Sequence, residues 1–354
     1  MSRRHALPLS TLILGVVLVA ATPWIPGGTR LIPTDLPTMD HVTALVGDGG
    51  SLFAATQAGE IWRYREHGWE RYASDPQGRA ITALLGDPRR TPVGTAVGLW
   101  VADGEILARE PPISARISAM IVTEQALVLA TGEGLRIHTE GAWHDPSPPL
   151  RAYQLYRQRG PGIDHIHAGT IGDGIHGAPT TRLLGDWSPN DSGLPADIKV
   201  LSFAETPGGR LLAGTDRGLY WQRAPGAIWQ VLDVGLGTRR ILALHHDRGD
   251  DTRQRLWIGS DEGLFVAELS DDAQGELAAS EPARPIPAHR APPEVGVGWI
   301  VATDGRLFVS AGQVYQVTTV PLRDRYLLTV AGAGLIGVGL WLALRRRLQR
   351  TARI

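Results

Sequence analysis

One pattern recurs along the middle of the chain: an apolar stretch, a short polar turn that usually contains glycine, and a second apolar stretch. "SLFAATQAGEIWRY" and "RLWIGSDEGLFVA" are two examples. The copies begin at Ser51, Gly98, Ala126, His165, Arg210, Arg255 and Arg306. Two apolar runs joined by a tight turn are typical of a β-hairpin, so the repeat predicts an all-β fold built from one unit.

Further strands are predicted on both sides of each hairpin. Most copies follow another short apolar run, such as "HVTALVGD" or "RILALHHD", and several precede an aromatic-led piece such as "WERYAS". Each unit then has four antiparallel strands in about 40 residues, the size of a propeller blade. A closed ring of such blades protects its sheet edges. We therefore predict a single β-propeller over residues 29–318, with seven four-stranded blades; six or eight stay open because the second and fourth copies are irregular.

The ring also needs a closing strand. The last copy ends at Val317, shortly after its hairpin, whereas residues 29–39 ("TRLIPTDLPTM") resemble the outermost-strand pieces of later units. We expect this N-terminal segment to complete the last blade.

The turn of the repeat contains residues that could also serve a hydrolase. Ser260, Asp261 and Glu262 form such a triplet, but the same place in the fifth copy has Thr215, Asp216 and Arg217. A hydroxyl, two polar residues and then glycine persist, which predicts a hairpin turn that needs positive φ. The structural glycines expected in these turns are Gly59, Gly134, Gly174, Gly218 and Gly263.

Both ends of the chain contain membrane signals. Residues 1–25 have a basic start and an apolar core, as in a cleaved signal peptide or an N-terminal anchor. Residues 326–344 are uncharged and long enough for a transmembrane helix, and the basic tail 345–354 should stay in the cytoplasm. These signals predict a propeller on the periplasmic or outer side of a bacterial inner membrane.

The C-terminal apolar segment also contains "GAGLIG", which matches the glycine fingerprint of dinucleotide-binding folds. The strand, helix and acidic residue that this fingerprint requires are missing, so no cofactor is predicted. Ala333 and Gly337 are instead expected to let another membrane helix approach closely.

Composition excludes several classes of site. The chain has no cysteine, which rules out disulfides, thiolate zinc sites and cysteine nucleophiles. The formal net charge is -1, and the middle of the chain is mildly acidic once the arginines of both ends are set aside. Nucleic-acid binding is therefore not expected.

Histidines give the strongest hint of chemistry, in "IDHIHAGTIGDGIHG". His165 and His167 alternate on a strand and should share a face, and His176 on the returning strand could oppose them. With Asp164 or Asp173 they could hold a zinc ion. Ordinary hydrogen-bonded strand histidines are the favoured interpretation, because no metal-binding spacing supports the ion.

Tryptophan recurs at related places in the repeats. Trp143, Trp187, Trp221, Trp229, Trp257 and Trp299 are expected to pack between blades. The alternative is a stacking platform around the central channel.

The units "LWIGSDEGLF", "LLAGTDRGLYW" and "LVLATGEGLRI" resemble the repeats of two-component regulator propellers. These are extracytoplasmic sensor modules of hybrid sensor kinases. The resemblance implies a propeller that binds or senses a ligand, although no kinase or other output domain is expected in this chain.

The predicted function is binding, sensing or scaffolding for an envelope protein or glycan, with any signal passed to a separate membrane partner. The alternative is a propeller-type carbohydrate hydrolase or lyase, for which no catalytic motif is found. An enzyme should gather acidic and histidine side chains in the central channel, whereas a binding module should place its distinctive residues on an outer rim.

Overall fold

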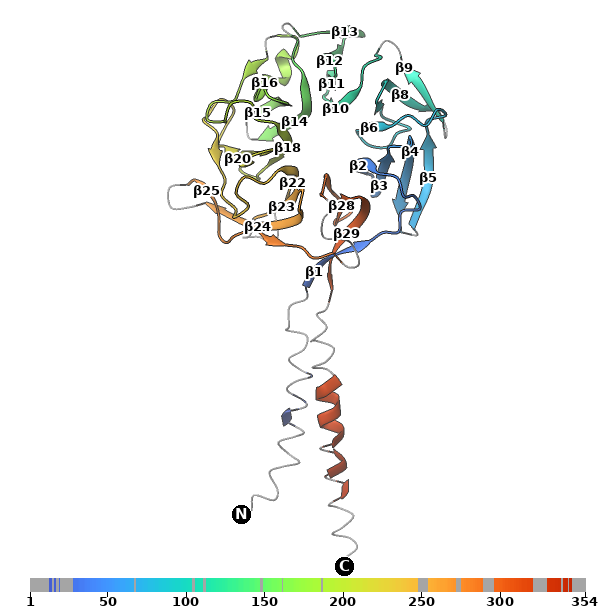
Figure 1. Ribbon diagram of the computed structural model, residues 1–354, viewed down its shortest axis with the longest axis vertical. Helices are drawn as coiled ribbons and strands as arrows, with labels where there is room; N and C mark the ends of the chain where they lie inside the picture. The colour runs from blue at the N-terminus through green and yellow to red at the C-terminus, as the bar shows by residue number, and fades with distance from the viewer. Residues whose placement is uncertain are drawn as a thin grey trace, which may run out of the picture. The chain divides into compact units, whose positions relative to one another are not determined.

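The strands form seven blades around a central axis (Figure 1). This computed structural model describes residues 28–320, except 67, 104–105, 111–112, 147–148, 161, 186, 248–253, 272–274 and 289–295, and scattered residues nearer both ends. Leu31–Val317 make one compact unit. The all-β, seven-blade prediction is confirmed.

Within a blade, antiparallel strands follow one another from the axis outward in chain order. Blade 1 contains β2 (Val42–Asp48), β3 (Ser51–Thr56), β4 (Glu60–Arg65) and β5 (Gly68–Ser74). Blade 2 contains β6 (Ile81–Leu84), β7 (Val93–Thr95), β8 (Gly98–Asp103) and β9 (Ile106–Glu110). Blade 3 contains β10 (Ile117–Val122), β11 (Ala126–Thr131), β12 (Gly134–Thr139) and β13 (Ala142–His144).

The later blades repeat this plan. Blade 4 contains β14 (Ala152–Gly160), β15 (Ile163–Thr170), β16 (Ile175–Pro179), the 3-10 helix η3 (Thr180–Arg182) and β17 (Ser188–Pro189). Blade 5 contains β18 (Val200–Glu205), β19 (Leu211–Thr215), β20 (Gly218–Gln222) and β21 (Gln230–Val231). Blade 6 contains β22 (Ile241–Asp247), β23 (Gln254–Ser260), β24 (Gly263–Asp271) and β25 (Leu277–Ala279), with β26 (Arg284–Pro285) also paired to β24.

Blade 7 is built from both ends of the propeller. Its strands are β27 (Trp299–Thr303), β28 (Arg306–Ala311), β29 (Gln313–Val320) and, outermost, β1 (Gly28–Pro33). Thr34 continues the contact beyond β1, because its main-chain N–H and its hydroxyl both donate to the carbonyl of Val314, at 3.0 and 2.8 Å. The N-terminal strand therefore closes the ring, as the sequence predicts.

The turn between the second and third strands of a blade is held by its hydroxyl residue. In blade 5, Thr215 Oγ1 donates to the carbonyl of Gly218 at 2.8 Å and accepts the N–H of Arg217 at 3.0 Å. Ser260 makes the same two bonds in blade 6. The triplet that begins at Ser260 is therefore the corner of a blade.

Glycine ends this turn for two reasons. The five predicted glycines all have positive φ. At Gly218, φ is 101° and a Cβ atom would lie 2.6 Å from the carbonyl oxygen of Gly237. A side chain there would meet both backbone strain and a clash with the connection to the next blade.

Seven apolar clusters hold the described part of the ring together, each between two neighbouring blades. The cluster between blades 7 and 1, for example, buries Phe308 against Leu45 and Leu52. The tryptophans predicted to pack between blades all belong to these clusters or lie against them. Inter-blade packing is therefore confirmed as their use, and Trp299 lines the central channel as well.

The glycine of "AGT" in the second strand lets neighbouring blades approach closely. A Cβ atom on Gly214 would lie 2.7 Å from Cγ2 of Ile241, on the innermost strand of the next blade. The repeat's glycine therefore makes room for an apolar side chain of its neighbour.

The terminal segments are described only in part. Most of residues 1–25 and of the tail 345–354, together with 326–329, lie outside the described residues. Among those described, no helix combines the length and the apolarity that a bilayer crossing requires. Ala333 and Gly337 lie in a helical stretch and are both exposed, so their packing against another helix stays a prediction.

Candidate functional site

The central channel is lined by one residue from the innermost strand of each blade. In six blades that strand has a β-bulge at its second residue. The bulged residues are Thr43, Thr82, Ser118, Tyr153, Leu201 and Leu242, and together with Trp299 they line a cavity of about 260 Å³. A bulge turns a side chain away from the regular pleat, so the same irregularity repeated around the ring aims these residues at the axis.

Hydroxyl groups tie one side of the channel together. Thr43 donates to the carbonyl of Ile81 in blade 2, and Thr82 donates to that of Ile117 in blade 3. Ser118 continues the series to blade 4 through the carbonyl of Ala152, at 3.4 Å. The larger side chains at this place in blades 4–6, which are Tyr153, Leu201 and Leu242, make no such hydrogen bond, and Tyr153 is 46% exposed. The channel wall is therefore cross-linked on one side and lined by larger side chains on the other.

Four cations surround the end of the channel at which the innermost strands begin, which we name the entrance face. Each comes directly before the first paired residue of its strand, in blades 3, 4, 5 and 6. The residues, named the basic rim, are Arg116, Arg151, Lys199 and Arg240. All are exposed, and Arg116 and Arg240 line the channel itself. His41 and Ala80 hold the same place in blades 1 and 2.

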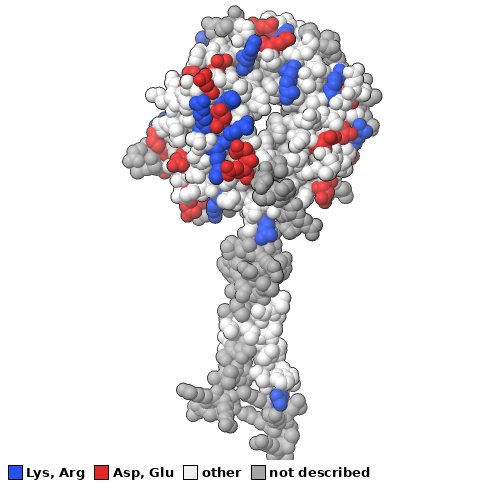
Figure 2. All heavy atoms as spheres, viewed as in Figure 1, with Lys and Arg blue, Asp and Glu red and all other residues white. Residues whose placement is uncertain are grey.

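Among the described residues, no carboxylate forms an ion pair with any of the four members of the basic rim. Carboxylates do lie nearby, because Asp261 lines a pocket with Arg240 and three aspartates line the inter-blade pocket with Arg151. Two carboxylates of nearby turns have other partners. Asp216 accepts the main-chain N–H of Lys199 at 2.9 Å, and Glu262 pairs with Arg239 at 2.9 Å. In Figure 2, Lys and Arg side chains lie around the central opening of the disc, with Asp and Glu beside them on one side. Like charges on one arc attract an anion to the channel mouth.

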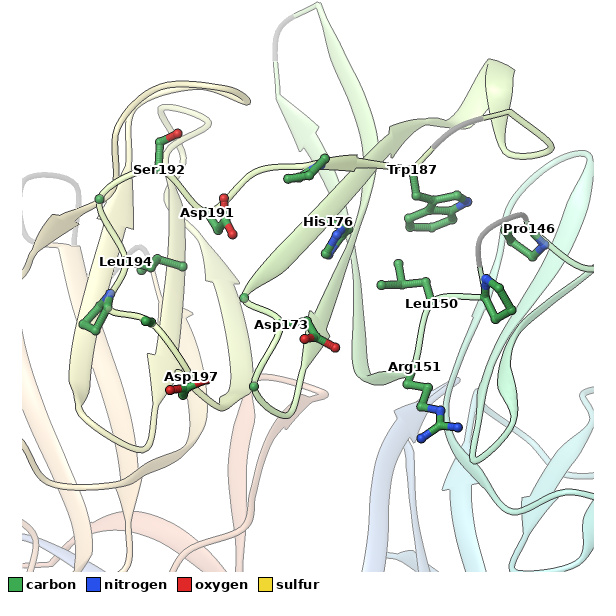
Figure 3. A pocket seen from close by; sticks show the side chains of 17 residues that line it. Pro146, Leu150, Arg151, Asp173, His176, Trp187, Asp191, Ser192, Leu194 and Asp197 are labelled. Atoms are coloured by element: carbon green, nitrogen blue, oxygen red, sulfur yellow. The ribbon is translucent and has the colours of Figure 1, made fainter.

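An inter-blade pocket of about 1190 Å³ adjoins the basic rim through Arg151 (Figure 3). Loops that the repeats do not share form much of its wall, and four prolines stiffen that wall: Pro146, Pro149, Pro189 and Pro195. His176 points into the pocket, with Trp187 and Leu150 on one side and Asp191 on the other. Burial lowers the pKa of His176, which favours the neutral ring at pH 7. The pocket therefore offers apolar faces beside hydrogen-bond acceptors.

The three candidate histidines do not meet. His165 and His167 share a face of β15, as predicted, with ring centroids 6.3 Å apart. His176 pairs with Ala168, however, whereas His167 pairs with Gly177. Because neighbouring residues on a strand face opposite sides, His176 lies on the other face of the sheet. The zinc alternative required all three rings to converge, and they do not.

Neither candidate aspartate, Asp164 or Asp173, joins the His165–His167 pair. Asp164 accepts two hydrogen bonds from Arg157, both at 2.8 Å, and these hold the pKa of Asp164 at about 2. Asp173 lies in the turn before β16 and lines the inter-blade pocket with His176. Among the described residues, no group of three or more His, Cys, Asp or Glu is placed to hold a metal ion.

Sequence reasoning missed the basic rim, although its signal is visible. "RISAM", "RAYQL", "KVLSF" and "RILAL" each begin with a cation just before the innermost strand, and Lys199 is the chain's single lysine. Aligning the first strands of the units, as well as their hairpins, would have found it.

Comparison with solved structures supports the propeller fold. The extracellular domain of BT4673 from B. thetaiotaomicron, named as a hybrid two component system protein, superposes with a TM-score of 0.65 at 15% identity, over 82% of this chain and 39% of that domain. An ancestral GH74 enzyme gives 0.63 at 16% identity, over 85% of this chain and 46% of the enzyme. YCF48 bound to D1 peptide gives 0.58 at 12% identity, over 82% of this chain and 96% of YCF48.

This likeness shows the fold. The resemblance to two-component regulator propellers is confirmed at that level, with a chain that spans 39% of the length of the BT4673 domain. No protein-family model matches the chain, and no curated protein matches it.

Proposed function

We propose that this chain is an extracytoplasmic binding module, held at a membrane by its terminal segments, whose entrance face binds a carboxylate-bearing part of an envelope protein or glycan. The observation that carries the proposal is the basic rim, in which four cations from successive blades have no carboxylate partner among the described residues. Arg116 and Arg240 would hold the anion at the channel mouth. Arg151 and Lys199 would extend the contact along the entrance face.

The channel favours binding over hydrolysis. A glycoside hydrolase needs two carboxyl groups on either side of the bond that it cleaves. None of the described residues that line the channel is Asp, Glu or His. The likeness to a GH74 enzyme concerns the fold, so a carbohydrate hydrolase is the weaker proposal.

The extracytoplasmic location rests on the sequence of the two ends. Residues 1–25 and 326–344 are apolar segments with arginines beside them, and these arginines favour the cytoplasmic side. If the propeller senses its ligand, we propose that a membrane partner passes on the signal.

Titration of the purified full-length chain tests this proposal. The probes are a deca-glutamate peptide and an oligogalacturonate, each compared with a neutral counterpart: deca-glutamine and a maltodextrin. We expect at least one anionic probe to bind more tightly than its neutral counterpart by about 30-fold or more, and its binding to weaken as salt is raised. Tighter binding of deca-glutamate would indicate a protein partner, and tighter binding of the oligogalacturonate would indicate a glycan. Equal affinity for neutral and anionic probes, or no binding of either anion, would contradict the proposal.

A further inference from the structure

His167 is fully buried in blade 4, and its two ring nitrogens have different surroundings. Nε2 lies 2.8 Å from Oε1 of Gln158, whose amide nitrogen donates to the carbonyl of Gly209 at 2.6 Å. Since the amide nitrogen must face that carbonyl, the amide oxygen faces the histidine, and Nε2 carries the proton. Nδ1 then holds the lone pair, and it has no hydrogen-bond partner.

Space lies next to this lone pair. His167 lines a cavity of about 230 Å³ together with His165, Gly177 and Ser188. Gly177 is the residue opposite His167 across the β15–β16 pair, and a Cβ atom there would lie 3.5 Å from Nδ1. Glycine therefore keeps a side chain away from this nitrogen, which is itself buried.

His165 adds a second buried nitrogen to the same cavity. Its Nδ1 is also buried without a partner, and its ring lies on the same face of β15, tilted 24° from that of His167. Both belong to the wall of one cavity. A buried polar nitrogen without a partner is costly. Two such Nδ1 atoms in one small cavity favour a ligand that accepts lone pairs, provided that the proton of the His165 ring is on Nε2.

The chemistry of the two rings selects the class of ligand. Neutral imidazoles are preferred ligands of zinc, nickel and copper ions, whereas calcium and magnesium prefer oxygen. In His167 the hydrogen bond from Nε2 to Gln158 leaves Nδ1 as the nitrogen with the lone pair. A histidine that binds a metal commonly donates its other ring N–H to a carbonyl or carboxylate oxygen, the role of Gln158 Oε1 here. No carboxylate lines this cavity among the described residues.

We propose that His165 and His167 bind a divalent transition-metal ion through their Nδ1 atoms, with Gln158 as the positioning residue and water in the remaining coordination positions. This His165–His167 site uses two members of the predicted histidine cluster and excludes His176. It is independent of the basic rim and of the proposed function.

Isothermal titration of the full-length chain without a histidine tag, first treated with EDTA and then freed of it, tests the site with NiCl₂, ZnCl₂ and MgCl₂. We expect one equivalent of Ni²⁺ or Zn²⁺ to bind, and no Mg²⁺. Three variants should each weaken binding about tenfold or more. His165→Gln removes a ligand, and Gly177→Val fills the space beside Nδ1 of His167. Gln158→Leu removes the hydrogen bond that positions the His167 ring. His138→Gln is the matched control outside the site and should have no effect.

Two further measurements keep the test independent of folding. His165 is only partly buried, so His165→Gln should unfold at the same temperature as the wild-type chain. Electron paramagnetic resonance of bound Cu²⁺ should show coupling to two imidazole nitrogens in the wild type and to one in folded His165→Gln. Failure of the wild-type chain to bind Ni²⁺, Zn²⁺ or Cu²⁺, or unchanged binding in both His165→Gln and Gly177→Val, would overturn the proposal.

Discussion

Replacing Arg116 and Arg240 together with glutamine is expected to weaken binding of the better anionic probe by about 30-fold. Both side chains line the channel mouth, are exposed and have no carboxylate partner among the described residues. Each exposed ion pair with the ligand should contribute up to about 1 kcal/mol, so losing two costs up to about 2 kcal/mol of binding free energy. Calorimetric titration of the double variant at low salt measures the change.

A matched control removes the same charge from the other face. Arg90 lies between β6 and β7, and Arg182 ends η3 after β16; both are exposed and lie away from the entrance face. The Arg90→Gln and Arg182→Gln double variant should bind the probe within about twofold of the wild type, because screening reduces the effect of distant charges. Equal losses in the two double variants would show that net charge, and not the basic rim, attracts the anion.

Leu31→Asp is expected to lower the free energy of unfolding by about 3 kcal/mol or more. Leu31 belongs to the outermost strand of blade 7, is 4% exposed and packs in the cluster between blades 6 and 7. A carboxylate there would lose the apolar contacts and be buried without a partner. Because β1 closes the ring, the loss should unfold the propeller as a whole in urea, followed by circular dichroism.

Val231→Asp provides the comparison for this stability measurement. Val231 also lies on an outermost strand, β21, but is 68% exposed. The same charge should therefore change the unfolding free energy by no more than about 0.5 kcal/mol. Equal unfolding free energies for Leu31→Asp and Val231→Asp would contradict the claim that β1 stabilises the ring by closing it.

The sequence predicts the blades well because their signals are local and repeated. In blades 2, 3, 5 and 6 a hydroxyl residue such as Thr215 and a glycine such as Gly218 fix the hairpin turn within four residues, and this recurrence makes the blades hard to mistake. Closure was also predictable, because the last copy lacks an outermost strand and residues 29–39 resemble one.

The candidate sites depend on geometry that the pattern does not contain. A difference of one residue in the pairing of β15 with β16 decides on which face His176 lies, and the turn at 171–174 hides that register. The environment of His167 depends on Gln158, nine residues earlier, and on Gly209 in the next blade. The basic rim forms because the fold places the residue before each innermost strand around the same central channel. The linear sequence does not show that these positions lie together.

Photo-cross-linking tests the central claim, that the entrance face is the binding surface, most directly. A deca-glutamate peptide with a benzophenone group is bound to the full-length chain, irradiated, and its attachment sites are located by mass spectrometry after digestion. The account predicts attachment within 116–118, 151–154, 199–201 or 240–242, or in the pocket segment 191–197. Attachment confined to turns of the opposite face, such as 48–50, 123–125 or 206–209, would contradict it.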